Sequence, residues 1–324
     1  MKPFSLVPVF KDYLWGGTKL KTRFNKRTEA SPLAESWELA AHPDGDCRIA
    51  NGSFAGTPLS EFLRKFPESL GSGRASGGGL PVLIKLIDAR EPLSVQVHPD
   101  DVYAMRTEGG AGKTEMWYVL DREPGAFLYC GFERDVSREE LTRRIADGTV
   151  TEVLHKAPVE PGDVFFMEAG TVHAIGAGIL IAEIQQSSNT TYRVFDYGRR
   201  GPDGKERPLH IEKALDVARR GPACSVPPGS RPPVILPGST LRRLARCAHF
   251  SVELLELSEH CEYRTDETSF LSLLCLEGSA RLVEGEWGFD IAKGDSVFVP
   301  ARKGSVFLEG RGTFLLTTVP DGEL

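Results

Sequence analysis

The sequence predicts a mainly β protein that consists of two β-barrel or jelly-roll halves and a few short decorating helices. Three observations support this fold class. Short segments rich in β-branched and aromatic residues recur between glycine, proline and aspartate, helical patterns are few, and one segment occurs twice. The chain has 324 residues, enough for two medium domains with a sizeable core.

Strand signals occur throughout the chain. Each is a short apolar run of strand-forming residues that is bounded by turn formers. They form one group in the first two thirds of the chain and another near its C-terminus. The predicted strands are 82–87, 93–97, 116–120, 164–167, 179–184, 270–276, 280–283, 296–299 and 313–318.

Three isolated segments show helical signals, and we expect them to decorate the sheets. Thr57 and Pro58 predict an N-cap followed by proline at the first helical position. Ser137, with a glutamate three residues later, predicts a capping box, and Gly148 stands just beyond that helix. The predicted helices are 58–66, 137–147 and 210–220.

Two stretches rich in glycine or proline predict loops. Residues 71–79 read GSGRASGGG; they lack the strand-loop-helix setting of a phosphate-binding loop and predict a flexible surface loop. Residues 221–238 hold six of the 22 prolines and predict a boundary between two halves. We therefore expect a catalytic domain over 1–220 with small helical insertions and a degenerate second domain over 239–324.

One segment of the chain occurs twice. PGDVFFMEAGTVHAI at 161–175 aligns without gaps with KGDSVFVPARKGSVF at 293–307, and both copies have Gly-Asp, an apolar strand and a turn at the same offset. His173 of the first copy corresponds to Ser305 of the second. The repeat predicts a duplicated barrel in which only the first copy keeps a metal ligand. Common turn chemistry before a strand is the alternative explanation.

Charge and hydropathy exclude some classes of protein. The net charge of −6 argues against a nucleic-acid-binding protein, which usually has a basic surplus. No window approaches the length of a transmembrane helix, and prolines and charges interrupt the apolar N-terminus, so no signal peptide is predicted. We expect a cytoplasmic monomer or weak homodimer with neither a membrane nor a nucleic acid as partner.

Four side chains on three predicted strands form a candidate metal site. Residues i and i+2 of a strand point to the same face, so Gln96 and His98 are expected to project together into the barrel. Glu115 begins the next strand, and His173 comes from a later one. Two imidazoles, a carboxylate and an amide oxygen suit a borderline cation such as Zn²⁺. Because only one ligand is charged, the metal would keep its Lewis acidity.

These residues lie within strings that resemble a known family. The first copy of the repeat is similar to the second cupin motif, and Gln-x-His replaces the usual His-x-His of the first. The strings that carry this resemblance are YLWGG, AESWELAAHPDG, PLSVQVHPDD, GKTEMWYVL, GTVHAIGAG and NTTYRVFDYGR. Through them, the chain resembles the short bacterial type I phosphomannose isomerases. The resemblance implies interconversion of mannose 6-phosphate and fructose 6-phosphate and an active-site role for Arg193. It also implies one zinc ion per chain, held by Gln96, His98, Glu115 and His173.

Aldose–ketose isomerisation removes a proton next to a carbonyl and passes through an enediolate. A divalent metal would polarise the carbonyl, and a neighbouring base would carry the proton between the two carbons. Glu183 lies in the strand that follows His173, and Lys113 lies two residues before Glu115. These two are our candidates for the acid/base work, and Arg193 is a third candidate for steering the proton transfer.

The sugar phosphate also needs cationic and hydrogen-bonding partners. Arg193 and Arg199 both lie in the segment YRVFDYGR, and arginine can donate two parallel hydrogen bonds to phosphate oxygens. Ser94 precedes Gln96 by two residues, so its hydroxyl is expected to open onto the same cavity. The predicted substrate contacts are therefore Ser94, Arg193 and Arg199.

Two other functions remain as alternatives. His98, His173 and Glu115 also match the facial triad of an iron-dependent cupin oxygenase. The second alternative is a non-catalytic sugar-phosphate-binding cupin, because no ligand set is visible between residues 240 and 324. The additional ligand Gln96 and the complete ligand set of the first half favour the isomerase. The sequence leaves open the identity of the base and the strict substrate among the aldose phosphates.

Overall fold

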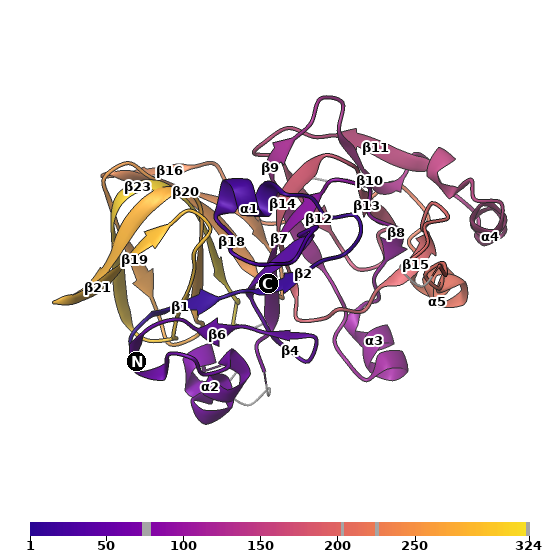
Figure 1. Cartoon of the computed structure of the whole chain (residues 1–324). Coiled ribbons are helices and arrows are strands. Elements are labelled where there is room, and N and C mark those ends of the chain that lie inside the picture. Colours follow the sequence, from indigo (N-terminus) through magenta and orange to yellow (C-terminus); the bar gives the residue numbers. More distant parts are fainter. Residues whose placement is uncertain (73–78, 202–203, 224–226, 322–324) are drawn as a thin grey trace.

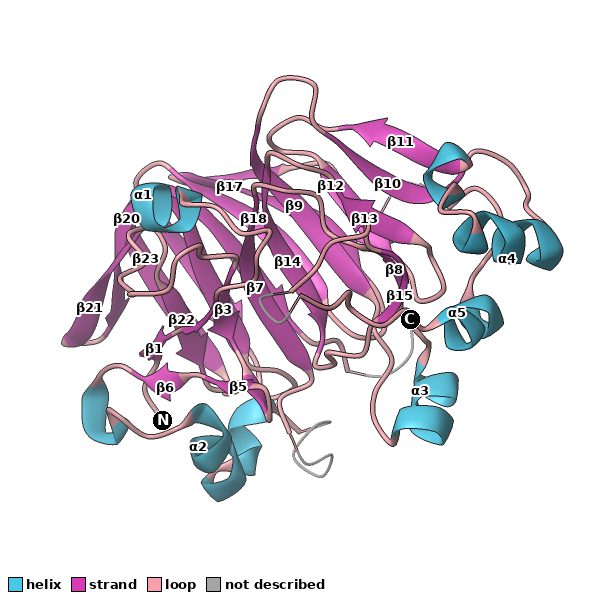
Figure 2. Cartoon of the chain, turned by 45° about the vertical axis from the view of Figure 1, so that its right-hand side comes forward, coloured by secondary structure: helices cyan, strands magenta, loops and turns pink. Residues whose placement is uncertain are grey.

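Strands dominate the structure, and the few helices lie around the outside of the sheets (Figure 1 and Figure 2). The computed structural model describes residues 1–72, 79–201, 204–223 and 227–321. The mainly β fold class is confirmed, whereas the predicted loop at 71–79 falls mostly outside the described residues. None of the described helices is long and apolar enough to cross a membrane.

A six-stranded antiparallel sheet is buried on both faces. In spatial order its strands are β12 (Val164–Met167), β9 (Glu115–Arg122), β14 (Ile179–Gln186), β7 (Val82–Ala89), β3 (Glu35–Leu39) and β2 (Val9–Lys11). In β9, Trp117 and Val119 contribute to one apolar core and Met116 to another. Burial on both faces explains why several of these strands read as continuous apolar runs in the sequence.

A five-stranded sheet covers one face of the six-stranded sheet. In spatial order its strands are β11 (Leu154–Pro158), β10 (Phe127–Phe132), β13 (His173–Ile175), β8 (Val95–Val97) and β15 (Tyr192–Phe195). Ile87 and Trp117 from one sheet and Leu128 and Ile175 from the other share an apolar core. No ladder joins the two sheets in the described part of the chain, so this half is a sandwich and not a closed barrel.

A ten-stranded sheet holds the C-terminal half. Leu255, Leu273 and Phe314 lie in a core of its own, whereas Phe298 and Leu315 pack in the core shared with the six-stranded sheet. In spatial order its main path is β16 (Val234–Leu236), β17 (Ser239–Arg246), β18 (Ser251–Leu257), β23 (Gly304–Thr318), β20 (Leu271–Glu284), β22 (Ser296–Val299), β1 (Phe4–Val7) and β6 (Arg48–Ile49). Off this path, β19 (His260–Thr265) pairs with β23, and β21 (Trp287–Ala292) pairs with β20.

The three predicted helices are present, and the structure adds two. The capping box is confirmed, because the Ser137 hydroxyl accepts a hydrogen bond from the N–H of Glu140 at 3.1 Å. The predicted position of Pro58 is wrong: its backbone is extended and it serves as the N-cap, so the helix begins one residue later. The described helices are α1 (Lys19–Phe24), α2 (Leu59–Lys65), α3 (Asp101–Glu108), α4 (Arg138–Ala146) and α5 (Ile211–Val217).

Helix α3 was not predicted, although its end signals are in the sequence. The Asp100 carboxylate caps its first turn, and Gly109 ends it in the left-handed conformation. Val102 and Met105 are exposed, so the segment has no apolar stripe that periodicity could reveal. Short 3₁₀ turns at 52–54, 67–70 and 150–152 and the hairpin of β4 (Ala41–His42) and β5 (Gly45–Asp46) complete the described elements.

The repeated segment forms the same turn in both halves. Gly162 and Gly294 have φ angles of +95° and +92°, which favour glycine. Asp163 and Asp295, which follow them, each accept a hydrogen bond from the backbone N–H three residues earlier, at 2.8 and 2.9 Å. The two Gly-Asp pairs therefore occupy equivalent positions, just before β12 and β22.

A buried ion pair ties the N-terminal region to the C-terminal half. Nζ of Lys26 lies 2.7 Å from Oε1 of Glu38 in β3 and donates to the carbonyl oxygen of Gly294 at 2.5 Å. Burial raises the pKa of Glu38, and the Lys26 ammonium opposes this rise. Each charge is therefore tolerated in the core because of the other.

We predict that Lys26→Met destabilises the protein by about 3–5 kcal/mol, because it leaves the Glu38 carboxylate buried without its counter-charge. Chemical denaturation monitored by circular dichroism measures this loss. The double variant Lys26→Met/Glu38→Met is the control and is expected to recover most of the stability, since no buried charge is left. A single variant as stable as the wild type would contradict the prediction.

Candidate active site

The predicted metal ligands converge between the two sheets of the N-terminal sandwich. Nε2 of His98 lies 3.6 Å from Oε2 of Glu115, and Nε2 of His173 lies 3.3 Å from its Oε1. All three side chains are buried, and one ligand atom from each lies within 4.8 Å of the others. Gln96 pairs with His173 across β8 and β13, and its amide nitrogen lies 3.4 Å from Nε2 of His173. The structure thus brings all four residues together.

Backbone carbonyls orient the two imidazoles. Nδ1 of His98 lies 2.8 Å from the carbonyl oxygen of Thr190, and Nδ1 of His173 lies 2.9 Å from that of Thr171. A carbonyl oxygen only accepts, so each Nδ1 carries the proton and each Nε2 presents its lone pair to the site. Burial lowers the pKa of both histidines, that of His173 to about 4, so both are neutral at pH 7 and able to bind a metal.

The Glu115 carboxylate fits a cation. Both of its oxygens are buried, and Oε1 accepts no hydrogen bond from the described residues. Its one close counter-charge is Lys113, whose Nζ lies 2.8 Å from Oε2. Burial raises the pKa of Glu115 to about 7, although Lys113 opposes this rise. A divalent cation would satisfy the carboxylate and the two lone pairs of the imidazoles at once, so the residues fit a metal.

Lys113 lies between the ligands and Glu183. Its Nζ is 3.3 Å from Nε2 of His98 and 4.0 Å from Oε1 of Glu183. The predicted common face of Lys113 and Glu115 is therefore present, because both side chains point between the sheets. Lys113 is buried, which distinguishes it from a loop lysine in water.

Glu183 is held as a carboxylate. Its Oε2 accepts a hydrogen bond from Nε1 of Trp117 at 3.0 Å, and Nζ of Lys85 lies 3.1 Å from its Oε1. Burial raises its pKa, but Lys85 and Lys113 outweigh burial and bring the pKa to about 2. Lys85 was missed at the sequence level. The feature of the sequence that could have identified Lys85 is that it is the single charged residue in the apolar run VLIKLI of β7.

A cavity of about 390 Å³ lies beside the ligand cluster and contains most of the predicted substrate contacts. Nε of Arg193 donates to the Ser94 hydroxyl at 3.2 Å, and its Nη1 donates to the carbonyl oxygen of Pro208 at 3.1 Å. Burial lowers the pKa of Arg193, and the neighbouring Arg207 contributes to this effect. The polar side chains that line the cavity include Lys85, Ser94, Gln96, Lys113, Glu183, Arg193 and Arg207.

Arg199 lies beside this cavity and does not line it. Its guanidinium forms an ion pair with Asp196 and donates to the carbonyl oxygen of Pro92 at 2.6 Å. Arg207 also donates to Asp196, at 2.7 Å, and reaches the cavity. The sequence did not single out Arg207, because nothing around it marks a site. The phosphate role of Arg199 stays a prediction.

The chain is similar to known proteins along nearly its whole length. The chain is 38% identical over 313 residues to the mannose-6-phosphate isomerase ManA of Bacillus subtilis, a match that covers 95% of this chain and 96% of that protein. It is 37% identical over 299 residues to the mannose-6-phosphate isomerase of Streptococcus mutans, with 92% of each chain covered.

The chain belongs to the type I phosphomannose isomerase family.

Family models and a solved structure agree with this assignment. The model of the type I phosphomannose isomerase catalytic domain matches residues 4–121, and the model of the mannose-6-phosphate isomerase cupin domain matches residues 240–319. The crystal structure of the mannose 6-phosphate isomerase from Bacillus subtilis superposes with a TM-score of 0.91 at 33% identity, over 98% of this chain and 99% of that one. A phosphomannose isomerase variant from Salmonella typhimurium, 19% identical with a TM-score of 0.77, shares the fold over the full length of both chains.

We predict that this type I phosphomannose isomerase binds one divalent metal ion per chain and that His173→Ala abolishes stoichiometric binding, because it removes a neutral imidazole from the cluster. Elemental analysis by inductively coupled plasma mass spectrometry after gel filtration measures the metal content. His155→Ala is the control, since His155 is partly exposed and pairs with Glu133. Equal metal content in both variants would place the metal elsewhere.

Proposed function

We propose that this enzyme is zinc-dependent and interconverts D-mannose 6-phosphate and D-fructose 6-phosphate through an enediolate. The observation that carries the proposal is the buried cluster of His98, Glu115 and His173 beside a cavity that contains cationic side chains. The mannose-6-phosphate isomerases of Bacillus subtilis and Streptococcus mutans, which align along nearly the whole chain, support the choice of substrate.

Ser94, Arg193 and Arg199 are our candidates for the phosphate contacts, and Arg207 joins them because it lines the cavity. Arg193 is held by the Ser94 hydroxyl and by the Pro208 carbonyl, which leaves donors of its guanidinium available to the cavity. Arg207 lines the same cavity and is fixed by Asp196. A phosphate dianion bound here would offset the mutual repulsion of the two guanidinium groups, and the forked donors would fix its orientation.

Gln96, His98, Glu115 and His173 would hold the zinc ion, with the Gln96 amide turned so that its oxygen faces the cation. When bound, zinc supplies a Lewis acid that polarises the sugar carbonyl and stabilises the negative charge of the enediolate. The two imidazoles are already oriented and neutral without a metal. The two Nδ1–H···O=C hydrogen bonds fix the imidazoles, and burial keeps both of them neutral.

Glu183 and Lys113 are our candidates for moving the proton between C2 and C1 of the sugar. Glu183 is ionised at neutral pH and therefore able to accept a proton, and Lys113 lies between it and the ligand cluster. A carboxylate with a pKa of about 2 is a weak base, so a bound substrate that separates Glu183 from Lys85 would strengthen it. Lys85 keeps its proton, because Glu183 and Glu35 outweigh its burial and raise its pKa. It is thus a donor to a sugar oxygen and not a base.

The family assignment favours the isomerase over the two alternatives. An iron-dependent oxygenase would use the same triad and a binding protein would need no chemistry, but the relatives that align over 95% and 92% of the chain are mannose-6-phosphate isomerases. The buried pairs of Lys85 with Glu183 and of Lys113 with Glu115 also provide proton carriers next to the ligands, for which a purely binding site has no use.

We predict that the purified enzyme converts mannose 6-phosphate to fructose 6-phosphate, that a chelator abolishes turnover and that added zinc restores it. A coupled assay for fructose 6-phosphate measures the reaction, and an oxygen electrode with added iron tests the oxygenase. If zinc-loaded protein shows no turnover, the proposed isomerase activity is wrong. Iron-dependent oxygen consumption would support the oxygenase instead.

Arg193→Ala should lower kcat/KM for mannose 6-phosphate by about 100-fold or more, because substrate that is no longer oriented seldom reaches the reactive geometry. Its metal content should stay at the wild-type level, since Arg193 contacts none of the three clustered ligands. Arg311→Ala, which removes an exposed arginine of the C-terminal half, is the control and should behave as the wild type. Wild-type turnover in Arg193→Ala would remove this residue from the site.

A further inference from the structure

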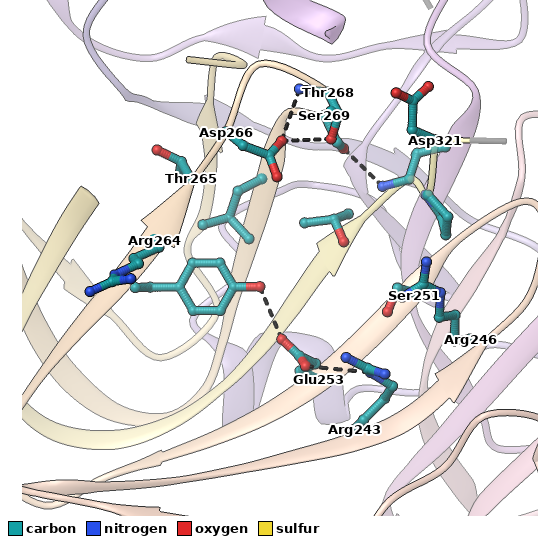
Figure 3. A pocket seen from close by; sticks show the side chains of 15 residues that line it. Arg243, Arg246, Ser251, Glu253, Arg264, Thr265, Asp266, Thr268, Ser269 and Asp321 are labelled. Carbon is teal, nitrogen blue, oxygen red and sulfur yellow. Dashed lines mark hydrogen bonds and ion pairs between the residues drawn. The ribbon is translucent and has the colours of Figure 1, made fainter. Parts of the chain in front are cut away.

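A second polar cavity opens inside the C-terminal half, apart from the active site. It has a volume of about 300 Å³ and is lined by side chains of β17, β18, β19 and β23 and of the loops that follow β19 and β23. Figure 3 shows Arg243, Arg246, Ser251 and Glu253 on one side of this cavity and Thr265 on the other. None of these residues lines the active-site cavity.

This cavity is the C-terminal counterpart of the active site. Met167 and Val299 hold the same place in the two copies of the repeat. Met167 pairs with the metal ligand Glu115, whereas Val299 pairs with Leu271, which lines the second cavity. Leu271 therefore stands where the first half has its carboxylate ligand.

Two other ligand positions are replaced in the same way. His173 pairs with Gln96 across two strands, whereas Ser305, its counterpart, pairs with Arg264. In the C-terminal half, Leu271 and Arg264 of the cavity lining thus stand in place of two ligands, and Ser305, which lies outside the lining, stands in place of a third. Glu253, Asp266 and Asp321 line the cavity, but among the described residues they form no cluster that could hold a metal, so the site is suited to binding without reaction.

A β-bulge directs two arginines into this cavity. Arg243 pairs with Glu253 and Arg246 with Ser251, and the register shifts between Arg243 and Ala245. Residues three apart in a regular strand face opposite sides, but here both arginines line the cavity. The residues between them, Leu244 and Ala245, are buried together in the core shared with the six-stranded sheet. The extra residue of the bulge produces this arrangement.

The lining contains a cation and a hydroxyl without partners. Glu253 is shared by Arg243, whose Nε lies 3.5 Å away, and by Tyr263, whose hydroxyl donates to it at 2.9 Å. Arg246 forms no side-chain hydrogen bond or ion pair with the described residues, and its buried Nε is unsatisfied. The buried hydroxyl of Thr265 is unsatisfied as well. Groups of this kind are costly to bury unless a ligand satisfies them.

We propose that the second cavity binds a sugar phosphate and does not transform it. The phosphate group would accept hydrogen bonds from Arg246 and Ser251, which are paired residues of neighbouring strands. The sugar hydroxyls would meet Thr265 and the carboxylate of Glu253, an acceptor that suits a polyol. A cavity of about 300 Å³ has room for a molecule of this size.

The test uses isothermal titration calorimetry of the full chain with D-sorbitol 6-phosphate, a sugar phosphate that has no carbonyl and so cannot be isomerised. We expect two binding events per wild-type chain. Arg246→Ala should weaken one of them by about 10- to 100-fold, the effect of losing a hydrogen bond to a charged group. Arg193→Ala should weaken the other. Arg311→Ala, an exposed arginine of the same half outside the cavity, is the matched control and should keep both.

A second variant keeps the test decisive if Arg246→Ala fails to fold. Thr265→Val preserves the shape of the side chain and removes the unsatisfied hydroxyl, so thermal stability should be kept or raised while the second binding event weakens several-fold. Wild-type binding that neither Arg246→Ala nor Thr265→Val weakens would overturn the proposal, whatever the number of binding events. Equally tight binding of inorganic phosphate would overturn its sugar part. Turnover of mannose 6-phosphate by Arg246→Ala should equal that of the wild type, so these outcomes do not depend on the proposed isomerase.

Discussion

The central constraint in this protein is the neutralisation of two carboxylates that are buried inside one antiparallel sandwich. Glu115 and Glu183 lie on adjacent strands of the six-stranded sheet, both directed at the five-stranded sheet. A buried charge without a partner costs several kcal/mol, so the fold needs a counter-charge for each. Lys113 and Lys85 supply these charges, and a metal held by the imidazoles would supply more. Stability and the proposed chemistry therefore involve the same four side chains.

Strand alternation concentrates the polar groups at one end of this sandwich. Along β9 and β14, every second residue points between the sheets, so Val119 and Ile181 fill the apolar end while the two carboxylates lie at the other. The apolar end fixes the distance between the sheets. The polar end cannot pack as densely around charged groups, and the cavity opens there. The cavity is lined by charged side chains because the inward-facing residues of these strands change from apolar to charged along the strand.

Local signals made most of this architecture predictable. Strands with both faces buried read as apolar runs, and the spacing of Gln96 and His98 predicted two side chains that the structure brings close to His173 and Glu115. Long-range partners were not predictable. Lys85 owes its role to Glu183, which lies 98 residues away in the chain but beside it in the sheet. The pairing of the N-terminal strand β1 with β22 likewise has no local signal, because a four-residue strand carries no information about its partner.

The Gly-Asp turn of the repeat shows that folding and chemistry reside in different residues of this protein. The same turn, with the same capping hydrogen bond, precedes β12 in the half with the predicted ligands and β22 in the other half. The predicted ligands are a few side chains, and the second copy keeps the turn although leucine, serine and arginine stand at three of their positions. The same turn thus forms around two different sets of side chains, so the residues that fold the repeat are not those that would react. The second copy can therefore acquire a ligand specificity that differs from that of the first.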